Sequence, residues 1–192
     1  MTASIAHITQ PMLGERVNGD AVVVRDEGAV LLLAVIDGLG HGPVAAQAAQ
    51  VAIEALASQS LHETVLSIAK NLHDRLRGTR GVAATLCLVR GSSIEVCAVG
   101  NVQLSSSNAT IPLVLSPGVL GSRVAKFHIC QGTLRAGARL ALFSDGISTR
   151  VALDEVRNLA PQEACRHVFE RFRKKEDDAT ILIADIDNQV TA

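Results

Sequence analysis

The stretch that decides the fold is residues 34–42, AVIDGLGHG, in which an apolar run ends in an acidic, glycine-rich turn. The run that leads into it, Val30 to Ile36, is apolar throughout rather than alternating, which is typical of a strand buried on both faces. Three glycines surround His41 directly before a predicted helix, and such a loop at a helix N-terminus favours anions such as phosphate. Asp37 is therefore predicted to stand where a buried strand meets an anion-binding loop.

The same arrangement of an apolar run and an aspartate recurs in three other places. Residues 141–146, ALFSDG, deliver Asp145 at the end of a run, and residues 176–183, EDDATILI, place Asp177 and Asp178 just before one. Residues 18–24, NGDAVVV, again set an aspartate, Asp20, at the start of a strand. Each aspartate alone is typical of an ordinary turn, so the argument depends on the repetition.

Carboxylates at the ends of buried strands are costly unless something pairs with them. Lys and Arg are scarce in these four segments, and carboxylate oxygens without nearby cations suit a hard divalent ion such as Mg²⁺ or Mn²⁺. Two such ions about 3.5–4 Å apart can share a hydroxide and polarise a phosphoryl oxygen. The four segments together therefore predict a two-metal hydrolase.

The order of elements predicts an α+β fold of antiparallel sheets with helices packed outside, because runs of strands flank a pair of helices without regular alternation. Helices are expected over residues 43–58, 61–76 and 161–172, each with an apolar face and two of them with Pro in the first turn. Val/Ile/Leu-rich strands bounded by turn residues are expected over residues 21–24, 30–36, 82–89, 94–99, 102–105, 112–115, 125–130, 139–143 and 180–186.

Length and composition limit the class of protein. The chain has 192 residues, 48% of them hydrophobic and 19% charged, which favours one globular domain, here residues 1–187 with a tail at 188–192. A formal net charge of -1, with four Phe and no Tyr or Trp, argues against nucleic acid or an anionic membrane as a partner. The four cysteines form no CxxC pair, and no apolar run is long enough to cross a bilayer. We therefore expect a cytoplasmic protein with reduced thiols.

The three motifs DGLGHG (37–42), SDG (144–146) and DDAT (177–180), in this order and at these separations, resemble those of the metal-dependent protein phosphatases, the PPM or type 2C family. The D-G-x-G-H-G form is similar to that of its bacterial branch, which is typified by the stage II sporulation protein E (SpoIIE) phosphatase domain. Within that branch, residues 80–85 and 98–102 are most similar to a feedback phosphatase of the stressosome. The resemblance covers nearly the whole chain, and the short flap regions that are common in this branch imply a monomer.

The resemblance implies an α-β-β-α sandwich of two stacked antiparallel sheets, with two Mn²⁺ or Mg²⁺ ions at one end. It implies that Asp37 bridges both ions, that the carbonyl of Gly38 completes the first site, and that Asp145 and Asp177 hold the second. Asp20 would act on the metals directly or through water. A metal-bridging hydroxide would attack phosphoserine or phosphothreonine, and substrates in this branch are phosphorylated STAS-domain proteins of stressosomes or sigma-factor modules, which would make the enzyme a negative-feedback element in stress signalling.

Some positions depart from the family pattern and stay open. Leu39 stands where eukaryotic members have a histidine, so His41 either orders the loop or lies near the leaving group. Arg16 is one residue off the phosphate-binding arginine of eukaryotic members and is either that residue or a surface side chain. Either Asp177 or Asp178 could be the ligand, although the family pattern favours the first.

Two other functions compete with the phosphatase. A pseudophosphatase would keep the fold as a regulatory binding module, but a dead site usually loses its ligands, and here the aspartates are present. A GHKL-type ATPase or kinase would use residues 37–40 as a nucleotide box, but the chain shows neither the preceding Asn-bearing helix nor the later glycine-rich lid.

Overall fold

The strand that carries Asp37 is buried along both faces. In the computed structural model, which describes residues 2–148 and 153–187, this strand, β3 (Leu31–Gly38), is buried at every position except Asp37. Because successive side chains of a strand point to opposite faces, Leu32, Ala34 and Ile36 enter one apolar cluster. Leu31, Leu33 and Val35 enter another. The unbroken apolar run therefore serves two cores.

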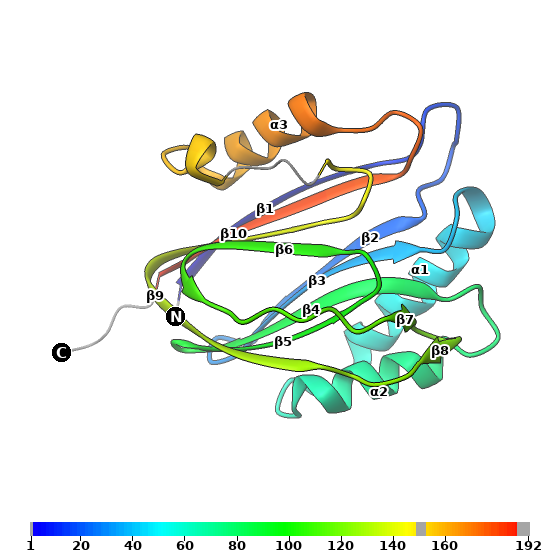
Figure 1. The fold of residues 1–192 in the computed structure, drawn as a ribbon, viewed down its shortest axis with the longest axis horizontal. Helices are drawn as coiled ribbons and strands as arrows, with labels where there is room; N and C mark the ends of the chain where they lie inside the picture. The colour runs from blue at the N-terminus through cyan, green and yellow to red at the C-terminus, as the bar shows by residue number, and fades with distance from the viewer. Residues whose placement is uncertain (1, 149–152, 188–192) are drawn as a thin grey trace.

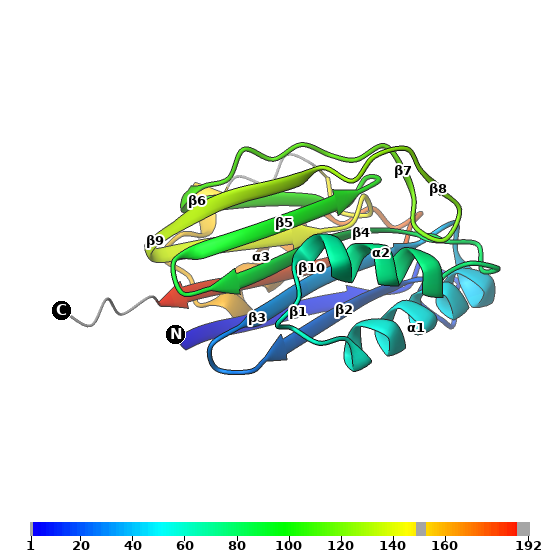
Figure 2. The same cartoon turned by 90° about the horizontal axis from the view of Figure 1, so that it is seen from below.

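Two antiparallel layers stack face to face and share one long strand. The strands are β1 (Thr2–Gln10), β2 (Asp20–Asp26), β3, β4 (Val82–Arg90), β5 (Ser93–Val99), β6 (Gln103–Thr110), β7 (Gly118–Val119), β8 (Arg123–Val124), β9 (Ile129–Phe143) and β10 (Ala179–Asp187). The first half of β9 pairs with β5, and its second half pairs with β10. One layer therefore runs β2-β3-β4-β5-β9 and the other β1-β10-β9-β6, as Figures 1 and 2 show.

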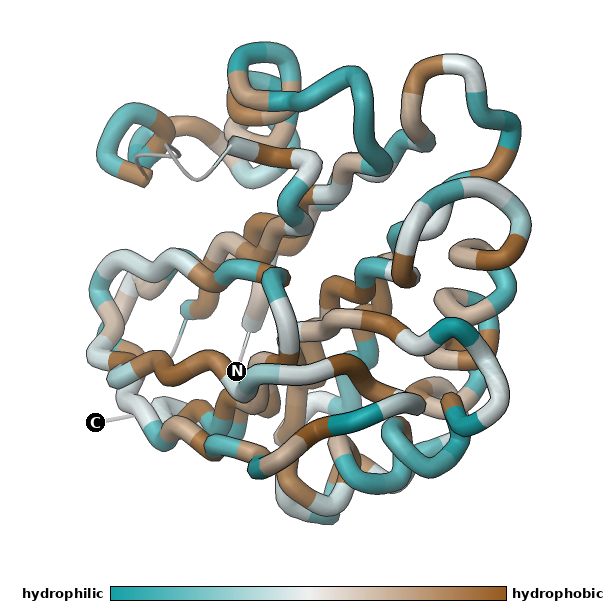
Figure 3. The backbone as a smooth tube through the Cα atoms, turned by 45° about the vertical axis from the view of Figure 1, so that its right-hand side comes forward, coloured by the Kyte–Doolittle hydropathy of each residue, from teal (hydrophilic) through white to brown (hydrophobic). Residues whose placement is uncertain are grey.

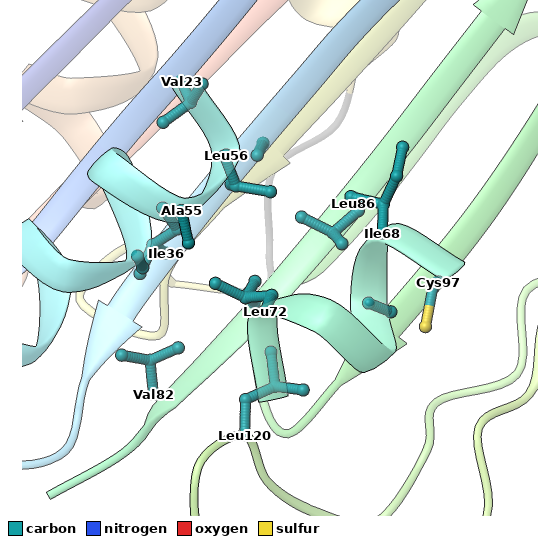
Figure 4. Close-up of a cluster of buried hydrophobic side chains, with 14 of the residues drawn as sticks. Val23, Ile36, Ala55, Leu56, Ile68, Leu72, Val82, Leu86, Cys97 and Leu120 are labelled. Carbon is teal, nitrogen blue, oxygen red and sulfur yellow. The ribbon is translucent and has the colours of Figure 1, made fainter. Parts of the chain in front are cut away.

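Helices cover the outer face of each layer. Helices α1 (Gly42–Ser58) and α2 (Val65–Arg75) lie against the first layer, and α3 (Pro161–Phe172) lies against the second (Figure 1). A short 3₁₀ helix, η1 (Leu153–Val156), precedes α3. Figure 4 shows side chains of α1 and α2, among them Leu56, Ile68 and Leu72, meeting Ile36 and Leu86 of the sheet. Figure 3 shows the apolar residues along the strands and hydrophilic residues at loops and outer helix faces.

Small residues on α1 let this helix lie close to the sheet. Its buried face is built from glycine, alanines and one leucine: Gly42, Ala45, Ala48, Ala49, Ala52, Ala55 and Leu56. A Cβ placed on Gly38 would lie 2.5 Å from the carbonyl oxygen of Ala45 and 2.8 Å from that of Gly19. The glycine after Asp37 is therefore required by close packing of two backbones against it, and not by a positive φ.

The predicted α-β-β-α architecture is confirmed, with three corrections to its elements. Strand β1 was not predicted, because its residues are only partly buried and carry no continuous apolar signal. The strand predicted over 112–115 is wrong: this segment forms no strand pairing within the described residues, apart from an isolated bridge at the adjacent Ser116. The strand predicted over 125–130 is also wrong as far as residue 128, because β9 begins at Ile129.

Three further features bear on the sequence predictions. The predicted helices over 43–58 and 161–172 agree with α1 and α3, whereas α2 starts at Val65, where Thr64 caps it by accepting a hydrogen bond from the Ser67 N–H. In the described parts of the chain, no helix is long and apolar enough to span a membrane. The tail predicted at 188–192 lies outside the described residues.

Candidate metal centre

The predicted acidic residues meet at one end of the sandwich. Asp20 opens β2 and stands opposite Asp37, near the end of β3, in the antiparallel register. Asp145 comes two residues after β9, and Asp177 comes two residues before β10, which pairs with β9. The topology thus brings four aspartates that are far apart in the sequence to adjacent strand ends.

A shallow pocket of about 160 Å³ opens over these strand ends. Its walls hold three of the predicted carboxylates together with residues of two neighbouring loops: Asp37, Leu39, Gly40, Ala83, Asn101, Asp145 and Asp177. Larger hollows of about 400 Å³ beside β7 and β8 and about 410 Å³ at the far end of β5 contain no acidic residue. A hollow of about 310 Å³ also holds two carboxylates, Asp185 and Asp187, but there Arg139 pairs with Asp185. The smaller pocket is therefore distinguished by three carboxylates with no cation among the described residues of its walls.

Asp20 lies under the pocket and is only 6% exposed. Its Oδ2 accepts a hydrogen bond of 2.6 Å from Ser144 Oγ, and that hydroxyl accepts one of 3.0 Å from the Thr180 N–H. The other carboxylate oxygen, Oδ1, is buried and has no hydrogen-bond partner in residues 2–148 and 153–187. A buried carboxylate oxygen without a donor is expensive, and a cation is the group that would satisfy it.

Burial and mutual repulsion raise the pKa values of three carboxyls in this cluster. Burial raises the pKa of Asp20 to about 7, against the hydrogen bond from Ser144, which lowers it. Burial, followed by the charges of Asp20 and Asp145, raises the pKa of Asp37 to about 8. Burial and then Asp145 also raise the pKa of Asp177. The cluster therefore holds more negative charge than the protein alone neutralises.

The donor set fits hard divalent ions. The four aspartates that meet here all offer carboxylates, which Mg²⁺ and Mn²⁺ prefer. No three His, Cys, Asp or Glu side chains of the described ranges already form a closed metal-ligand group, so water or substrate oxygens would complete the coordination shell, as is usual for Mg²⁺. The fit therefore depends on an open acidic pocket over a buried, unsatisfied Asp20, and not on a preformed protein cage.

The two adjacent aspartates at 177 and 178 have different roles. Asp178 is 2% exposed, and its two carboxylate oxygens accept hydrogen bonds from the Met12 N–H at 2.8 Å and the Gly19 N–H at 2.9 Å. It thereby ties the β1–β2 loop to the start of β10. Asp177 is half-buried and lines the pocket instead. The geometry favours Asp177 as the metal-facing residue of the pair.

The supporting contacts of three residues at the site were not predicted from the sequence. Asn101 donates a 2.7 Å hydrogen bond from Nδ2 to Asp145 Oδ2, and it follows β5 just as the aspartates adjoin their strands, so its place at a strand end was a usable signal. Ser144 and Asp178 act through contacts across 124 and 159 residues of chain. Nothing in the local sequence indicates such contacts.

His41 and Arg16, whose roles the sequence left open, are not among the residues that line the pocket. The Nδ1 atom of His41 is 2.9 Å from Glu15 Oε1, so the histidine is held by the β1–β2 loop as the N-cap residue of α1. It does not line the pocket. Arg16 is exposed. The backbone N–H of Gly38 donates to the Gly19 carbonyl at 3.0 Å, and metal binding by the carbonyl of Gly38 stays a prediction.

The raised pKa values predict how the stability of the metal-free protein depends on pH. Asp20 and Asp37 have folded pKa values of about 7 and about 8 against an ordinary value of 3.8, so the folded state binds more protons than the unfolded state between about pH 4 and 8. Stability should therefore fall as pH rises through this window. We expect the melting temperature in EDTA to drop by about 5–10 °C between pH 5.5 and 8.5.

Two comparisons separate this effect from ordinary titration. Mn²⁺ added at pH 8.5 should restore the melting temperature, because an ion that binds only the folded state stabilises it. The Asp37→Asn variant should lose the part of the pH slope that comes from Asp37, keep the part that comes from Asp20, and lose most of the Mn²⁺ effect. Equal slopes in the two proteins, measured by thermal melts monitored by circular dichroism, would contradict the prediction.

Several known proteins are similar to this chain in sequence and in fold. The model of the family "Stage II sporulation protein E (SpoIIE)" matches residues 27–187. The phosphoserine phosphatase RsbX of Bacillus subtilis (strain 168) is 23% identical over 180 residues, which cover 90% of this chain and 89% of RsbX. The family resemblance inferred from the motifs, including its similarity to RsbX, is confirmed.

Solved structures agree with this result. A chain from work on the bacterial stressosome, described as a modular system adapted to control secondary messenger signaling, is 33% identical with a TM-score of 0.89, over 96% of this chain and 100% of that one. A crystal structure of RsbX in complex with magnesium matches with a TM-score of 0.84 at 20% identity, over 95% of this chain and 94% of that one. The chain belongs to the SpoIIE family of PP2C-like phosphatases.

Proposed function

We propose that this protein is a Mn²⁺- or Mg²⁺-dependent protein serine/threonine phosphatase that acts on phosphorylated STAS-domain proteins. The observation that carries the proposal is the acidic pocket of Asp37, Asp145 and Asp177 over Asp20, whose buried Oδ1 has no partner in the described residues. Two divalent ions in such a pocket supply Lewis acidity toward a phosphoryl group and a nucleophilic water at neutral pH. Asp20, Asp37, Asp145, Asp177 and the carbonyl of Gly38 are the groups that we assign to them.

The surrounding residues hold these groups in place. Ser144 fixes one oxygen of Asp20, and Asn101 orients Asp145 through its Oδ2. Lys174 Nζ donates a 2.6 Å hydrogen bond to the backbone carbonyl of Asp145, which stiffens the turn after β9. Asp178 secures the loop that precedes Asp20. Rigid positioning of this kind is what phosphoryl transfer requires from a protein, because catalysis there is mainly orientation and charge stabilisation.

The proposed class of substrate is inferred from the proteins to which this chain is similar. RsbX is named a phosphoserine phosphatase. The solved structure whose chain is 33% identical to this one comes from work on the bacterial stressosome. We therefore assign phosphorylated STAS-domain proteins of a stressosome or sigma-factor module as substrates, with the enzyme as a negative-feedback element in the cytoplasm. We further propose that residues 1–187 form the single catalytic domain and that the enzyme works as a monomer.

The test is phosphate release from p-nitrophenyl phosphate and from a STAS-domain protein phosphorylated on serine, with Mn²⁺, with Mg²⁺ and with EDTA. We expect metal-dependent release, faster on the phosphoprotein because the shallow pocket offers little contact to a small ester. The phosphoprotein is included because an enzyme with narrow specificity could fail to hydrolyse p-nitrophenyl phosphate and still be a phosphatase. No release from either substrate by folded protein that binds Mn²⁺ would overturn the proposal in favour of a pseudophosphatase.

A further inference from the structure

One arginine at the rim of the acidic pocket is available for an anionic ligand. Arg80 precedes β4 and is exposed. A Cβ built on Gly40, a residue of the pocket wall, would lie 3.2 Å from Arg80 Nη1 and 3.3 Å from its Cζ and Nη2. The guanidinium therefore lies flat over the backbone of the loop that follows Asp37. A side chain at residue 40 would push it away.

The backbone around Arg80 is fixed on both sides. Thr79 Oγ1 donates to the Leu76 carbonyl at 2.7 Å and accepts from the Gly81 N–H at 3.0 Å, which attaches the turn to the end of α2. The Gly81 carbonyl accepts a 3.1 Å hydrogen bond from the Leu39 N–H of the pocket loop. A Cβ on Gly81 would lie 2.5 Å from the Leu120 carbonyl oxygen. The turn that carries Arg80 is thus held between the pocket loop and the β7–β8 segment.

The side chain of Arg80 is not used for structure. In residues 2–148 and 153–187 its guanidinium takes part in no hydrogen bond and none of the ion pairs, although an acidic cluster lies nearby. Lys174, the other cation at this end, differs, because its Nζ already donates to the Asp145 carbonyl. Arg80 is therefore a positioned cation whose donors remain free.

The charge balance of the acidic pocket indicates what Arg80 could bind. Asp20, Asp37, Asp145 and Asp177 balance two divalent ions in formal charge, so a phosphoryl dianion that enters the pocket needs positive charge from another source. A guanidinium suits phosphate oxygens, because its planar fork can donate two parallel hydrogen bonds. We infer that Arg80 binds the phosphoryl group of the substrate and the phosphate product. This inference rests on the phosphatase function proposed above.

The experiment measures phosphate binding separately from metal binding and turnover. In Mn²⁺-loaded protein, Arg80→Ala should raise both KM for p-nitrophenyl phosphate and the inhibition constant of inorganic phosphate by about 10- to 30-fold. The turnover number kcat should change less than KM. Arg80→Lys should recover part of the loss, and the stabilisation by Mn²⁺ in a thermal melt should not change.

Two control arginines make the result specific. Arg77 is exposed and lies three residues away, where its Nε pairs with Asp74 at 3.1 Å, so Arg77→Ala should leave KM and phosphate inhibition within twofold. Arg16→Ala tests the arginine that the sequence left open as a phosphate-binding residue. A phosphate inhibition constant that moves in Arg16→Ala and not in Arg80→Ala, or a loss of Mn²⁺ stabilisation in Arg80→Ala, would overturn the inference.

Phosphate binding by Arg80 can be tested even if the protein proves to have no phosphatase activity. If Mn²⁺-loaded wild type hydrolyses neither phosphoester, the proposed function fails, and calorimetric titration with inorganic phosphate then tests Arg80 alone. Phosphate binding by the wild type that weakens about 10- to 30-fold in Arg80→Ala would uphold the inference. Equal binding by both proteins, or none by the wild type, would overturn it.

Discussion

Asp37→Asn should lower metal-dependent phosphate release by about a thousandfold or more, which corresponds to about 4 kcal/mol of transition-state stabilisation. Asp37 lies at the centre of the acidic cluster, because it is opposite Asp20 in the sheet and lines the pocket with Asp145 and Asp177. Its burial, together with the charges of its neighbours, raises its pKa to about 8. Asparagine keeps the shape but removes the charge on which divalent binding depends. The measurement is kcat/KM on the phosphorylated STAS protein at saturating Mn²⁺.

A matched variant lies at the other end of the same hairpin. Asp26 ends β2, is exposed, and accepts a 2.8 Å hydrogen bond from the Gly28 N–H. Asp26→Asn should leave kcat/KM within twofold. Retention of more than a tenth of the wild-type activity by folded Asp37→Asn protein would show that Asp37 is not at the centre of the site.

Gly146→Ala should be the most destabilising of the small changes near the site, at about 3 kcal/mol. A Cβ on Gly146 would stand 1.9 Å from the carbonyl oxygen of Asp178 and 2.9 Å from the Cα of Ala179. Both neighbours are backbone atoms of the segment that enters β10, so neither can rotate away. The melting temperature should fall by about 6–12 °C, and the displaced turn should also weaken Mn²⁺ binding.

The comparison for this variant is Gly28→Ala. Gly28 has a φ of +75° but nothing within 4 Å of its Cβ position, so the substitution carries only a backbone penalty of about 1 kcal/mol. If Gly28→Ala lowers the melting temperature as much as Gly146→Ala does, steric contact with Asp178 is not the reason for the glycine in the SDG motif.

Local patterns in the sequence were sufficient to predict antiparallel sheets with helices outside and the acidic residues, whereas the stacking of two sheets was predicted from the family resemblance. The unbroken apolar run through β3 indicates burial on both faces, and apolar faces at helical spacing indicate α1 and α3. Aspartates at strand ends indicate a shared edge, and four of them do meet there. The edge strand β1 was missed because partly buried residues give no continuous signal, and the segments 112–115 and 125–128 were misread because apolar residues alone do not ensure ladder pairing.

Only the tertiary structure decided which side chains support the site. The choice of Asp177 over Asp178 depends on which carboxylate meets the N–H groups of Met12 and Gly19, more than 150 residues away. The contacts of Ser144 with Asp20 and of Arg80 with the Gly40 loop likewise join distant segments. Hydrophobic periodicity and turn-forming residues predict only the structure of residues that are close together in the chain. Hydrogen bonds and close packing between distant strands are set by how the two layers stack, which the local sequence does not encode.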